Sequence, residues 1–571
     1  MSGFYGIYSL EQNHPEKVYQ HFYSYKFDNI VNEESRNGHF TFGRSVLDKF
    51  MDDRVLWEDA RFVVLFEGVC YNNPLPIPEF IIDLYKQHPD CLAKDIDGHF
   101  AGLIFDKTQN KLILFNDHLA SKSIYYYLDP QRSFFIFSSE LKVVAKMLDF
   151  FKIPKSYNLP GIYSFLAFGH YLGEHTSIKE IKRLSFASNY LFDANNFKIT
   201  YSRYFNYEKA QDFSLNKHTI LDNIDNLLLK SVKKEWNKDD EYKYDHYALL
   251  SGGLDSRVNI LLAKEMGWDS IHAITFAESK SSDEKIAKQI VEKNSFKHTF
   301  QALDNGEYLS KNIEEYVLAN DGMVSLLGSS HGYYTLSKID HSQYGLVHTG
   351  QIGDLLFGSY SFKVKDFKTR VLNELNFEGS SLKDKFDQFE EVLSPYQYLT
   401  YEQFVYEQKA INGTLNGDRT LSHFADLASP FYDKDLIKFC LTIPDIFKQN
   451  EAIYIEWMNK YHPKLTMYKW EKAGVKPSNV LKVKTGVFIK NSKVALKRKM
   501  GIHSGMNPFE KWAKSNSLIM LNLDNVYKSN LEHITVPSLR KDLTDLYTGT
   551  SNILQKMKVV TLLITLKIHF Q

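Results

Sequence analysis

The pattern of apolar and polar positions changes about one third of the way along the chain. Before residue 207, apolar runs rich in β-branched and aromatic residues follow one another closely, with short polar turns between them: Arg61–Cys70, Gly98–Asp106, Lys111–Phe115 and Phe134–Ser139. Runs of this kind predict successive hairpin strands, and the helical pieces after them predict sheets layered with helices.

Beyond residue 207, strand-like segments alternate with segments of helical spacing. An amphipathic helix is predicted from His218 to about Trp236, and the charged run Lys233–Lys243 is interpreted as a solvated surface turn. Apolar strands are predicted at His246–Leu250 and Ser270–Phe276, and a helix at Asp283–Asn294, where Asp283 provides a favourable first-turn charge. This strand–helix alternation predicts a parallel, doubly wound sheet that binds its ligand at the carboxyl ends of the strands.

Composition limits the classes of protein that fit. The 571 residues suffice for two to four domains of roughly 100–200 residues, and 43% hydrophobic with 24% charged residues is typical of a folded chain. Lys+Arg and Asp+Glu are both 69, which disfavours a general nucleic-acid or membrane binder but leaves a local basic patch open. Three scattered cysteines disfavour a disulfide framework or zinc site. No signal peptide is visible, and the apolar stretch Val559–Leu566 is too short to span a bilayer, so we expect a cytoplasmic protein.

The strongest chemical signal is the hexapeptide from Ser251 to Ser256, between a predicted strand and a predicted helix. Its paired glycines allow backbone N–H groups to approach an anion, and the following helix adds positive dipole at its N-terminus. Ser251 and Ser256 supply hydroxyl donors, and Asp255 suits a hard cation such as Mg²⁺. The segment therefore predicts a phosphate-binding turn, although the GxxxxGK[ST] pattern is absent.

This hexapeptide resembles the pyrophosphate-binding loop of the N-type ATP pyrophosphatases. In a chain of this length, the resemblance is to the asparagine synthetase and β-lactam synthetase family. It implies a glutamine amidotransferase-like αββα domain of the N-terminal-nucleophile type over residues 1–206, and an ATP-binding synthetase domain over 207–485. Residues 487–571 fall outside the matching motifs, so we expect 486–571 to form a C-terminal helical extension.

The N-terminal half resembles the amidotransferase domain at Gly98–Ala101, Asp117–Leu119 and Ser138–Lys142, but its chemistry departs from the family pattern. The family uses an N-terminal Cys nucleophile, whereas this chain has Ser2, whose hydroxyl is far less acidic. Glu67-Gly68 stands where the family has its glutamine-holding Asn-Gly-Glu, while Asp97 remains. We therefore predict a degenerate glutaminase site, and interpret Cys70 as a core residue.

A second glycine-rich turn follows the apolar segment that ends at His348. It resembles the second ATP loop of the family, and Asp354 matches the aspartate that binds Mg²⁺ together with the one at Asp255. The resemblance also implies an ATP and pyrophosphate site formed by Leu250, Ser251, Gly252, Gly253, Asp255, Ser256, Thr275 and Gly350.

Three further residues match catalytic positions of the family. Lys472 corresponds to a lysine that stabilises transition-state charge, and Asp426 stands at a glutamate position and is a candidate proton acceptor. Gln351 replaces the Glu of asparagine synthetases and the Tyr of β-lactam synthetases, which leaves the acyl substrate open.

The implied reaction uses ATP and Mg²⁺. A substrate carboxylate becomes an acyl-adenylate with release of pyrophosphate, and an amine then displaces AMP to give an amide. The amine is ammonia or part of a second substrate, the carboxylate is a small molecule or a peptide, and a homodimer is compatible with the family. A glutamine-hydrolysing asparagine synthase and a non-catalytic nucleotide-binding scaffold are the alternatives. Zero net charge disfavours an RNA-modifying pyrophosphatase.

Overall fold

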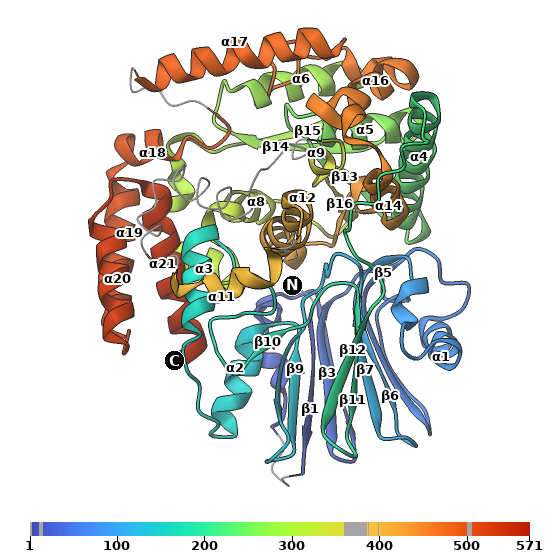
Figure 1. Ribbon diagram of the computed structural model, residues 1–571, viewed down its shortest axis with the longest axis vertical. Helices are drawn as coiled ribbons and strands as arrows, with labels where there is room; N and C mark the ends of the chain where they lie inside the picture. The colour runs from blue at the N-terminus through green and yellow to red at the C-terminus, as the bar shows by residue number, and fades with distance from the viewer. Residues whose placement is uncertain (1–2, 11–14, 359–384, 386, 398, 500–504) are drawn as a thin grey trace.

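The computed structural model describes residues 3–10, 15–358, 385, 387–397, 399–499 and 505–571 (Figure 1). The lower half of the molecule in Figure 1 consists of two sheets from the N-terminal part of the chain. The upper half contains a parallel sheet with its helices, and the helices after residue 508 stand on the left beside both halves.

Two antiparallel sheets, each of six strands, form the N-terminal half, in the orders β10-β8-β9-β1-β3-β2 and β12-β11-β7-β6-β5-β4. Their strands are β1 Gly3–Ser9, β2 Ile30–Asn37, β3 Phe40–Leu47, β4 Val55–Glu58, β5 Phe62–Cys70, β6 Gly98–Asp106, β7 Lys111–Asn116, β8 Tyr125–Asp129, β9 Phe134–Ser138, β10 Lys182–Arg183, β11 Ser188–Asp193 and β12 Lys198–Arg203.

These sheets pack face to face. One buried cluster joins Phe42 of β3 and Phe137 of β9 to Leu103 of β6, so the inner faces of both sheets share a core. The outer face of the second sheet packs on α1 (Ile77–Gln87), and the outer face of the first packs on α2 (Leu141–Phe150). The layers are therefore helix, sheet, sheet, helix, which agrees with the sandwich that the resemblance implies.

Five parallel strands form the sheet of the second half, in the order β15-β14-β13-β16-β17. The chain runs outward from β13 in one direction and then returns to the other side of β13, which makes the space between β13 and β16 the topological switch point. The predicted doubly wound sheet is thus confirmed. Its strands are β13 Asp245–Leu249, β14 Ile271–Ala277, β15 Lys297–Ala302, β16 Tyr344–His348 and β17 Leu427–Ala428.

Helices connect and cover these strands. The helices up to β16 are α3 Leu159–Phe168, α4 Lys217–Glu241, α5 Asp255–Glu265, α6 Ser282–Asn294, α7 Ile313–Ala319 and α8 Ser330–Leu336. Those between β16 and the C-terminal group are α9 Gly353–Leu356, α11 Glu390–Leu393, α12 Tyr401–Phe404, a π-helix Val405–Thr414, α13 Leu415–Asp418, α14 Lys434–Thr442, α15 Asp445–Lys448 and α16 Ala452–Tyr461.

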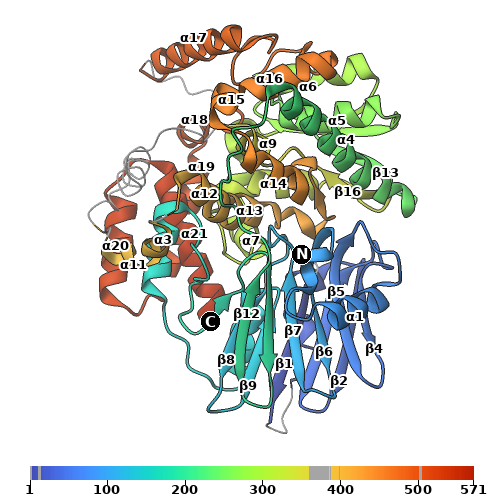
Figure 2. The ribbon, with the colours of Figure 1, turned by 45° about the vertical axis from the view of Figure 1, so that its right-hand side comes forward.

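The C-terminal residues are helical: α17 Val480–Lys499, α18 Phe509–Ser515, α19 Ser517–Leu531, α20 Pro537–Thr548 and α21 Ile553–Phe570. The apolar stretch Val559–Leu566 lies in α21, which is buried against α2, α3 and α7 and so joins the two halves (Figures 1 and 2). Within the described residues, no helix is long and apolar enough to cross a membrane. The boundaries at residues 206 and 485 remain predictions.

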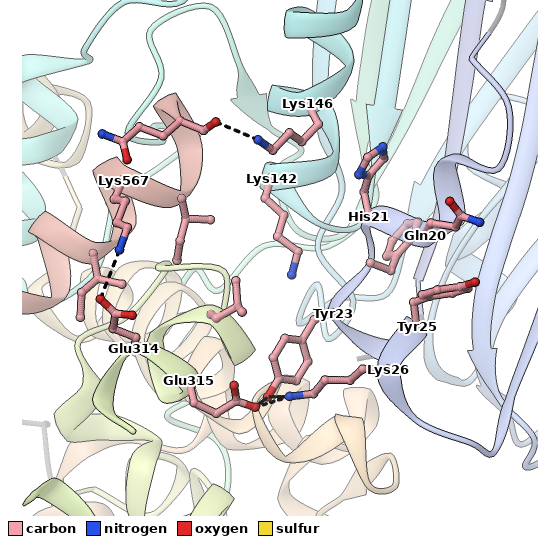
Figure 3. Close-up of a pocket in the computed structure, with 15 residues that line it drawn as sticks. Gln20, His21, Tyr23, Tyr25, Lys26, Lys142, Lys146, Glu314, Glu315 and Lys567 are labelled. Atoms are coloured by element: carbon pink, nitrogen blue, oxygen red, sulfur yellow. Dashed lines mark hydrogen bonds and ion pairs between the residues drawn. The ribbon is translucent and has the colours of Figure 1, made fainter. Parts of the chain in front are cut away.

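A cavity of about 620 Å³ lies where the two halves meet, lined by residues of α2, α7 and α21 and by the 3₁₀-helices Val18–His21 and Tyr23–Lys26. Its charged side chains contact partners (Figure 3): Lys26 with Glu315, Lys567 with Glu314 at 3.4 Å, and Lys146 with a backbone carbonyl at 3.1 Å. Because these charged side chains already have partners, they stabilise the junction of the two halves and do not form a charged binding pocket.

The end of α4 differs from the sequence prediction. The run Lys233–Lys243 is not a solvated turn, because α4 continues to Glu241 and buries Lys238 and Asp239. The Lys238 ammonium pairs with the buried Asp53 carboxylate at 2.9 Å, so the helix can continue into the interior with its charge compensated.

Asp239 joins α4 to both central strands. Its Oδ2 accepts hydrogen bonds from His348 Nε2 (2.9 Å) and His246 Nδ1 (3.2 Å), and its Oδ1 accepts one from the Leu346 amide (2.8 Å). These donors lower the pKa of the buried carboxyl. An aspartate with two histidines is also a possible metal-ligand set. Here three N–H donors satisfy both oxygens without a cation.

We expect Asp239→Asn to lower the free energy of unfolding by about 2 kcal/mol, because it removes the charge that two buried imidazoles face. Urea denaturation at neutral pH measures this loss. Asp269→Asn, whose side chain is 78% exposed and contacts neither histidine, is the matched control and should change stability by less than about 0.5 kcal/mol. Equal effects of the two substitutions would contradict the role of Asp239.

Candidate active site

The glycine turn after β13 is held by its own hydroxyl groups. Ser256 Oγ lies 3.0 Å from Ser251 Oγ and accepts the Ser251 amide at 3.1 Å, and Ser251 Oγ accepts the Gly253 amide at 3.1 Å. The turn leads directly into α5, which begins at Asp255. The turn therefore places two hydroxyls and a helix N-terminus at the carboxyl end of β13, as the sequence predicts.

Gly252 faces the opposite side of the turn. Its amide donates to the Asp283 carboxylate of α6 (2.9 Å), and its carbonyl accepts the Glu471 amide (3.0 Å). A Cβ at Gly252 would lie 2.9 Å from the Glu471 Cβ. Asp283 thus does more than supply a charge in the first turn of α6. Its hydrogen bond to the Gly252 amide also fixes the position of the glycine turn. It also occupies the Gly252 amide that we expected to bind phosphate.

The second glycine-rich turn packs directly on the first. A Cβ at Gly350 would come within 2.2 Å of the Ser256 amide nitrogen, and a Cβ at Gly353 within 2.6 Å of the Asp255 carboxyl carbon. The Asp354 amide donates to Asp255 Oδ2 at 3.0 Å. Only glycine allows this approach of two backbones, and the result is that the two predicted metal carboxylates belong to adjoining turns.

The pKa values of these two carboxyls reflect their burial and their proximity. Burial and the Asp354 charge raise the pKa of Asp255 to about 8, and burial also raises the pKa of Asp354, against the lowering effect of Lys472. Two carboxylates that resist ionising together form a favourable ligand pair for a divalent cation, which supplies the missing positive charge. The donor set fits Mg²⁺, which Asp255 and Asp354 could hold.

Lys472 reaches this site from the segment before α17. Its ammonium lies 2.6 Å from Glu451 Oε1, while 46% of its side chain is exposed. Lys472 and Glu451 are among the groups that shift the pKa of Asp354, so the structure brings the predicted lysine together with the carboxylates. Glu451, just before α16, is a site residue that the sequence did not indicate.

A pocket of about 240 Å³ opens beside the two turns at the switch point. It includes six of the predicted ATP residues and Gln351, and it is lined by Leu249, Leu250, Ser251, Gly253, Asp255, Ser256, Ile274, Phe276, His331, Thr349, Gly350, Gln351 and Met506.

Thr275 does not line this pocket. It is buried and its hydroxyl donates to the Leu250 carbonyl at 2.9 Å, while Ile274 and Phe276 on either side of it line the pocket. Successive side chains of a strand point to opposite faces of the sheet. Assigning Ile274 and Phe276 of β14, in place of Thr275, to the face at the pocket would therefore have identified the lining residues. His331 and Met506 come from distant segments and carry no sequence signal.

Gln351 connects the pocket to a buried carboxyl that the sequence reasoning missed. Its amide Nε2 donates to Asp418 Oδ1 (3.1 Å), and the Tyr432 hydroxyl donates to Asp418 Oδ2 (3.0 Å). Burial raises the pKa of Asp418 to about 7. A carboxyl with a pKa near neutrality can take up a proton there, which makes Asp418 a candidate proton acceptor.

The predicted proton acceptor, Asp426, is placed differently. It is buried between the two halves, where it pairs with Arg54 and, at 2.5 Å, with Lys122 of the N-terminal half. These cations lower its pKa to about 2. A carboxylate that is so strongly stabilised in its charged form is a poor base, so the predicted role of Asp426 does not fit the structure.

Residues 223–471 match the asparagine synthase family, and residues 78–205 match the glutamine amidotransferase domain. This chain belongs to the asparagine synthetase family. The order of its two matching regions gives it an N-terminal amidotransferase domain.

Individual relatives are distant in sequence. A putative glutamine-hydrolysing asparagine synthetase 2 of Methanocaldococcus jannaschii is 25% identical over 380 residues, which cover 62% of this chain and 70% of that protein. Putative asparagine synthetase 1 of the same organism is 24% identical over 428 residues, covering 70% and 67%. Among solved structures, the glutamine phosphoribosylpyrophosphate amidotransferase of B. subtilis is 8% identical, with a TM-score of 0.22, and covers 53% of this chain and 91% of that one.

In this asparagine synthetase family member, two predicted site residues of the amidotransferase domain form ion pairs, Glu67 within that domain and Asp97 with the synthetase half. Glu67 is buried and lies 3.4 Å from the Lys122 ammonium and 3.7 Å from Arg54 Nε. Asp97 pairs at 2.9 Å with Lys234 of α4. At Gly68, φ is +130°, and a Cβ there would lie 2.0 Å from the His99 carbonyl.

Ser2 lies outside the described residues, while β1 begins at Gly3 on the side of the sheets that faces the synthetase half (Figure 1). Both carboxylates of the expected glutaminase site, Glu67 and Asp97, are thus engaged by cations.

The coupled carboxylates generate a pH prediction for the metal-free protein. The folded-state pKa of Asp255, about 8, exceeds its unfolded value of about 3.9, so the folded state binds the additional proton and stability falls as pH rises from about 4 to 8. Asp255→Asn should therefore be more stable than wild type at pH 8, by about 1 kcal/mol after solvent screening, and should lose that advantage near pH 4.

Thermal denaturation at several pH values, with and without excess Mg²⁺, measures this difference. Mg²⁺ should stabilise wild type at pH 8 and leave Asp255→Asn nearly unchanged. A pH-independent difference between the two proteins would contradict the coupling.

Proposed function

We propose that this protein is an AMP-forming ligase that makes an amide bond through an acyl-adenylate. The observation that carries the proposal is the pair Asp255 and Asp354 on two abutting glycine turns at the switch point of the parallel sheet. Membership of the asparagine synthetase family supports ATP-dependent amide ligation. The N-terminal-nucleophile type of the first domain and the pyrophosphatase type of the second are parts of this proposal.

The first step is adenylation. A carboxylate oxygen of the substrate attacks the α-phosphorus of ATP, the bond to the β,γ-pyrophosphate breaks, and pyrophosphate leaves. The hydroxyls of Ser251 and Ser256, which line the pocket, would hold the pyrophosphate at the N-terminus of α5. Lys472 would offset developing negative charge. Mg²⁺, held by Asp255 and Asp354, would neutralise phosphate charge when bound.

The adenine nucleoside would occupy the pocket of about 240 Å³. Its apolar wall is formed by Leu250, Ile274, Phe276 and Met506, which suits a heterocyclic base. Gly350, whose backbone packs on the start of α5, also lines this pocket.

The second step is aminolysis. The amine nitrogen attacks the acyl carbon, the bond to the adenylate oxygen breaks, AMP leaves, and the nitrogen gives up a proton. We assign proton uptake to Asp418, which Gln351 and Tyr432 hold beside the pocket. Gln351 lines the pocket as a neutral hydrogen-bonding group in place of a charged one.

We propose that the amine does not come from glutamine hydrolysed by this chain. Support comes from Ser2 at the nucleophile position and from Glu67, which is engaged by Arg54 and Lys122 rather than open to a substrate. Free ammonia or an amine-bearing second substrate would then supply the nitrogen. The names of the relatives describe glutamine hydrolysis for those proteins only.

The ligase proposal is tested by pyrophosphate and AMP release from ATP with a panel of carboxylic acids. Asp255→Ala and Asp354→Ala should each lower the rate by about 10²–10³-fold, because each removes charge compensation at the triphosphate. Asp269→Ala, a carboxylate that is 78% exposed on the surface, is the matched control and should leave the rate unchanged. ATP cleavage that survives both site substitutions would refute the mechanism.

The amidotransferase domain is tested separately, by measuring glutamate release from glutamine. We expect no release above background, and amide formation that depends on added ammonia or another amine. Glutamate release that Ser2→Ala abolishes would show that this domain is an active glutaminase.

A further inference from the structure

Helix α17 (Val480–Lys499) carries a row of large apolar side chains on its outer face. Leu481 is 75% exposed, Phe488 73% and Leu496 61%, and Ile489 beside them is 48% exposed. Spacings of seven and eight residues place the first three on one side of the helix. Apolar side chains exposed together in this way mark an interaction surface.

The opposite face of α17 is already packed on the protein. Val483 is buried, and a Cβ at Gly486 would lie 2.6 Å from the Ala473 carbonyl. Lys490 points inward and pairs with Glu471 at 2.5 Å. The helix is therefore firmly attached along one face, and its outer row does not serve the packing of the described chain.

Basic residues flank the outer row. Lys482, Lys484 and Lys493 are exposed and lie on its two sides, and the helix contains no aspartate or glutamate. The sequence of the last turn adds Lys497, Arg498 and Lys499. The protein has no net charge, so this concentration of basic residues on one helix is a local feature.

The helix also lies at an extremity of the molecule. Both views show α17 along the top, on the far side of the synthetase half from the N-terminal sheets (Figures 1 and 2). A helix of this length is about 30 Å long, so the row can meet a flat surface over several turns.

We propose that α17 binds an anionic lipid surface, with its apolar row in the interfacial region and its lysines at the headgroup phosphates. A narrow apolar row with lysines on both sides is the pattern of a helix that lies in a membrane interface, where long basic side chains reach outward from a shared plane. A second copy of this chain fits less well, because pairing two α17 helices would bring lysines against lysines with no acidic residue on either helix.

This docking would place the synthetase site near the lipid surface. Lys490 joins α17 to Glu471, and the Glu471 amide bonds to the Gly252 carbonyl of the first glycine turn. The segment that bears Lys472 therefore lies between the docking helix and the active site. The proposal is independent of the reaction, because it rests on the exposed face of α17 alone.

Vesicle co-sedimentation of the full chain tests the proposal. Vesicles of phosphatidylcholine with phosphatidylglycerol should bind wild type at least about ten-fold more tightly than pure phosphatidylcholine, and added NaCl should weaken binding. The triple variant Leu481→Ser, Phe488→Ser, Leu496→Ser should lose at least about ten-fold in affinity, since it removes the inserted side chains. Lys482→Gln with Lys484→Gln and Lys493→Gln should lose about ten-fold on anionic vesicles only.

The control is Phe213→Ser, because Phe213 is 81% exposed elsewhere on the surface and its loss should leave vesicle binding unchanged. Circular dichroism establishes that each variant is folded. Absence of sedimentation with anionic vesicles, or binding that the serine variant retains, would overturn the proposal. A wild-type protein that does not bind vesicles but dimerises with increasing concentration, and whose dimerisation the serine variant abolishes, would also overturn the proposal. The apolar row would then be a contact between two copies of the chain.

Discussion

The close approach of two backbone turns is the constraint on which the site depends. Gly350 and Gly353 pack against the start of α5 at distances that a side chain would not permit, and this contact puts Asp354 beside Asp255. The cost is the burial of two neighbouring carboxylates: burial raises the pKa of each, and the charge of Asp354 raises the pKa of Asp255 further. The structure concentrates negative charge where a divalent cation and a triphosphate would meet. This arrangement favours the binding of a divalent cation, which the proposed adenylation would require.

Charge also decides how the two halves fit together. Asp426 from the synthetase half is enclosed by Arg54 and Lys122 from the amidotransferase half, with Glu67 completing a buried group of four. Such groups are stable only while every member is present, because removing one leaves an uncompensated buried charge. The amidotransferase domain therefore supports the synthetase half whether or not it hydrolyses glutamine.

Helix α17 uses its lysines in two different ways. Within one helix, Lys490 turns inward to Glu471, while Lys482 and Lys484 stay exposed beside an apolar row. The inner contact leads through Glu471 to the first glycine turn. A surface that binds lipid and a site that binds nucleotide would thus share one short, rigid connection.

Local chemistry determined much of what could be predicted from the sequence. The Gly-Gly turn needs its own two serines and the strand and helix beside it, so its form and the position of Asp255 follow from adjacent residues. The strand at Gly98–Asp106 and the second turn at Asp354 are local in the same sense.

Tertiary structure decided which charges are available for chemistry. Asp426 reads as a free carboxylate in the sequence, but its partners Arg54 and Lys122 lie 372 and 304 positions away. The sequence likewise predicts a solvated turn at the end of α4, because Asp53, which neutralises Lys238, lies 185 residues away in the chain. Asp418 becomes a candidate base only because the fold buries it beside Gln351. A side chain's ionisation depends on burial and on neighbouring charges, and both are properties of long-range contacts rather than of sequence neighbours.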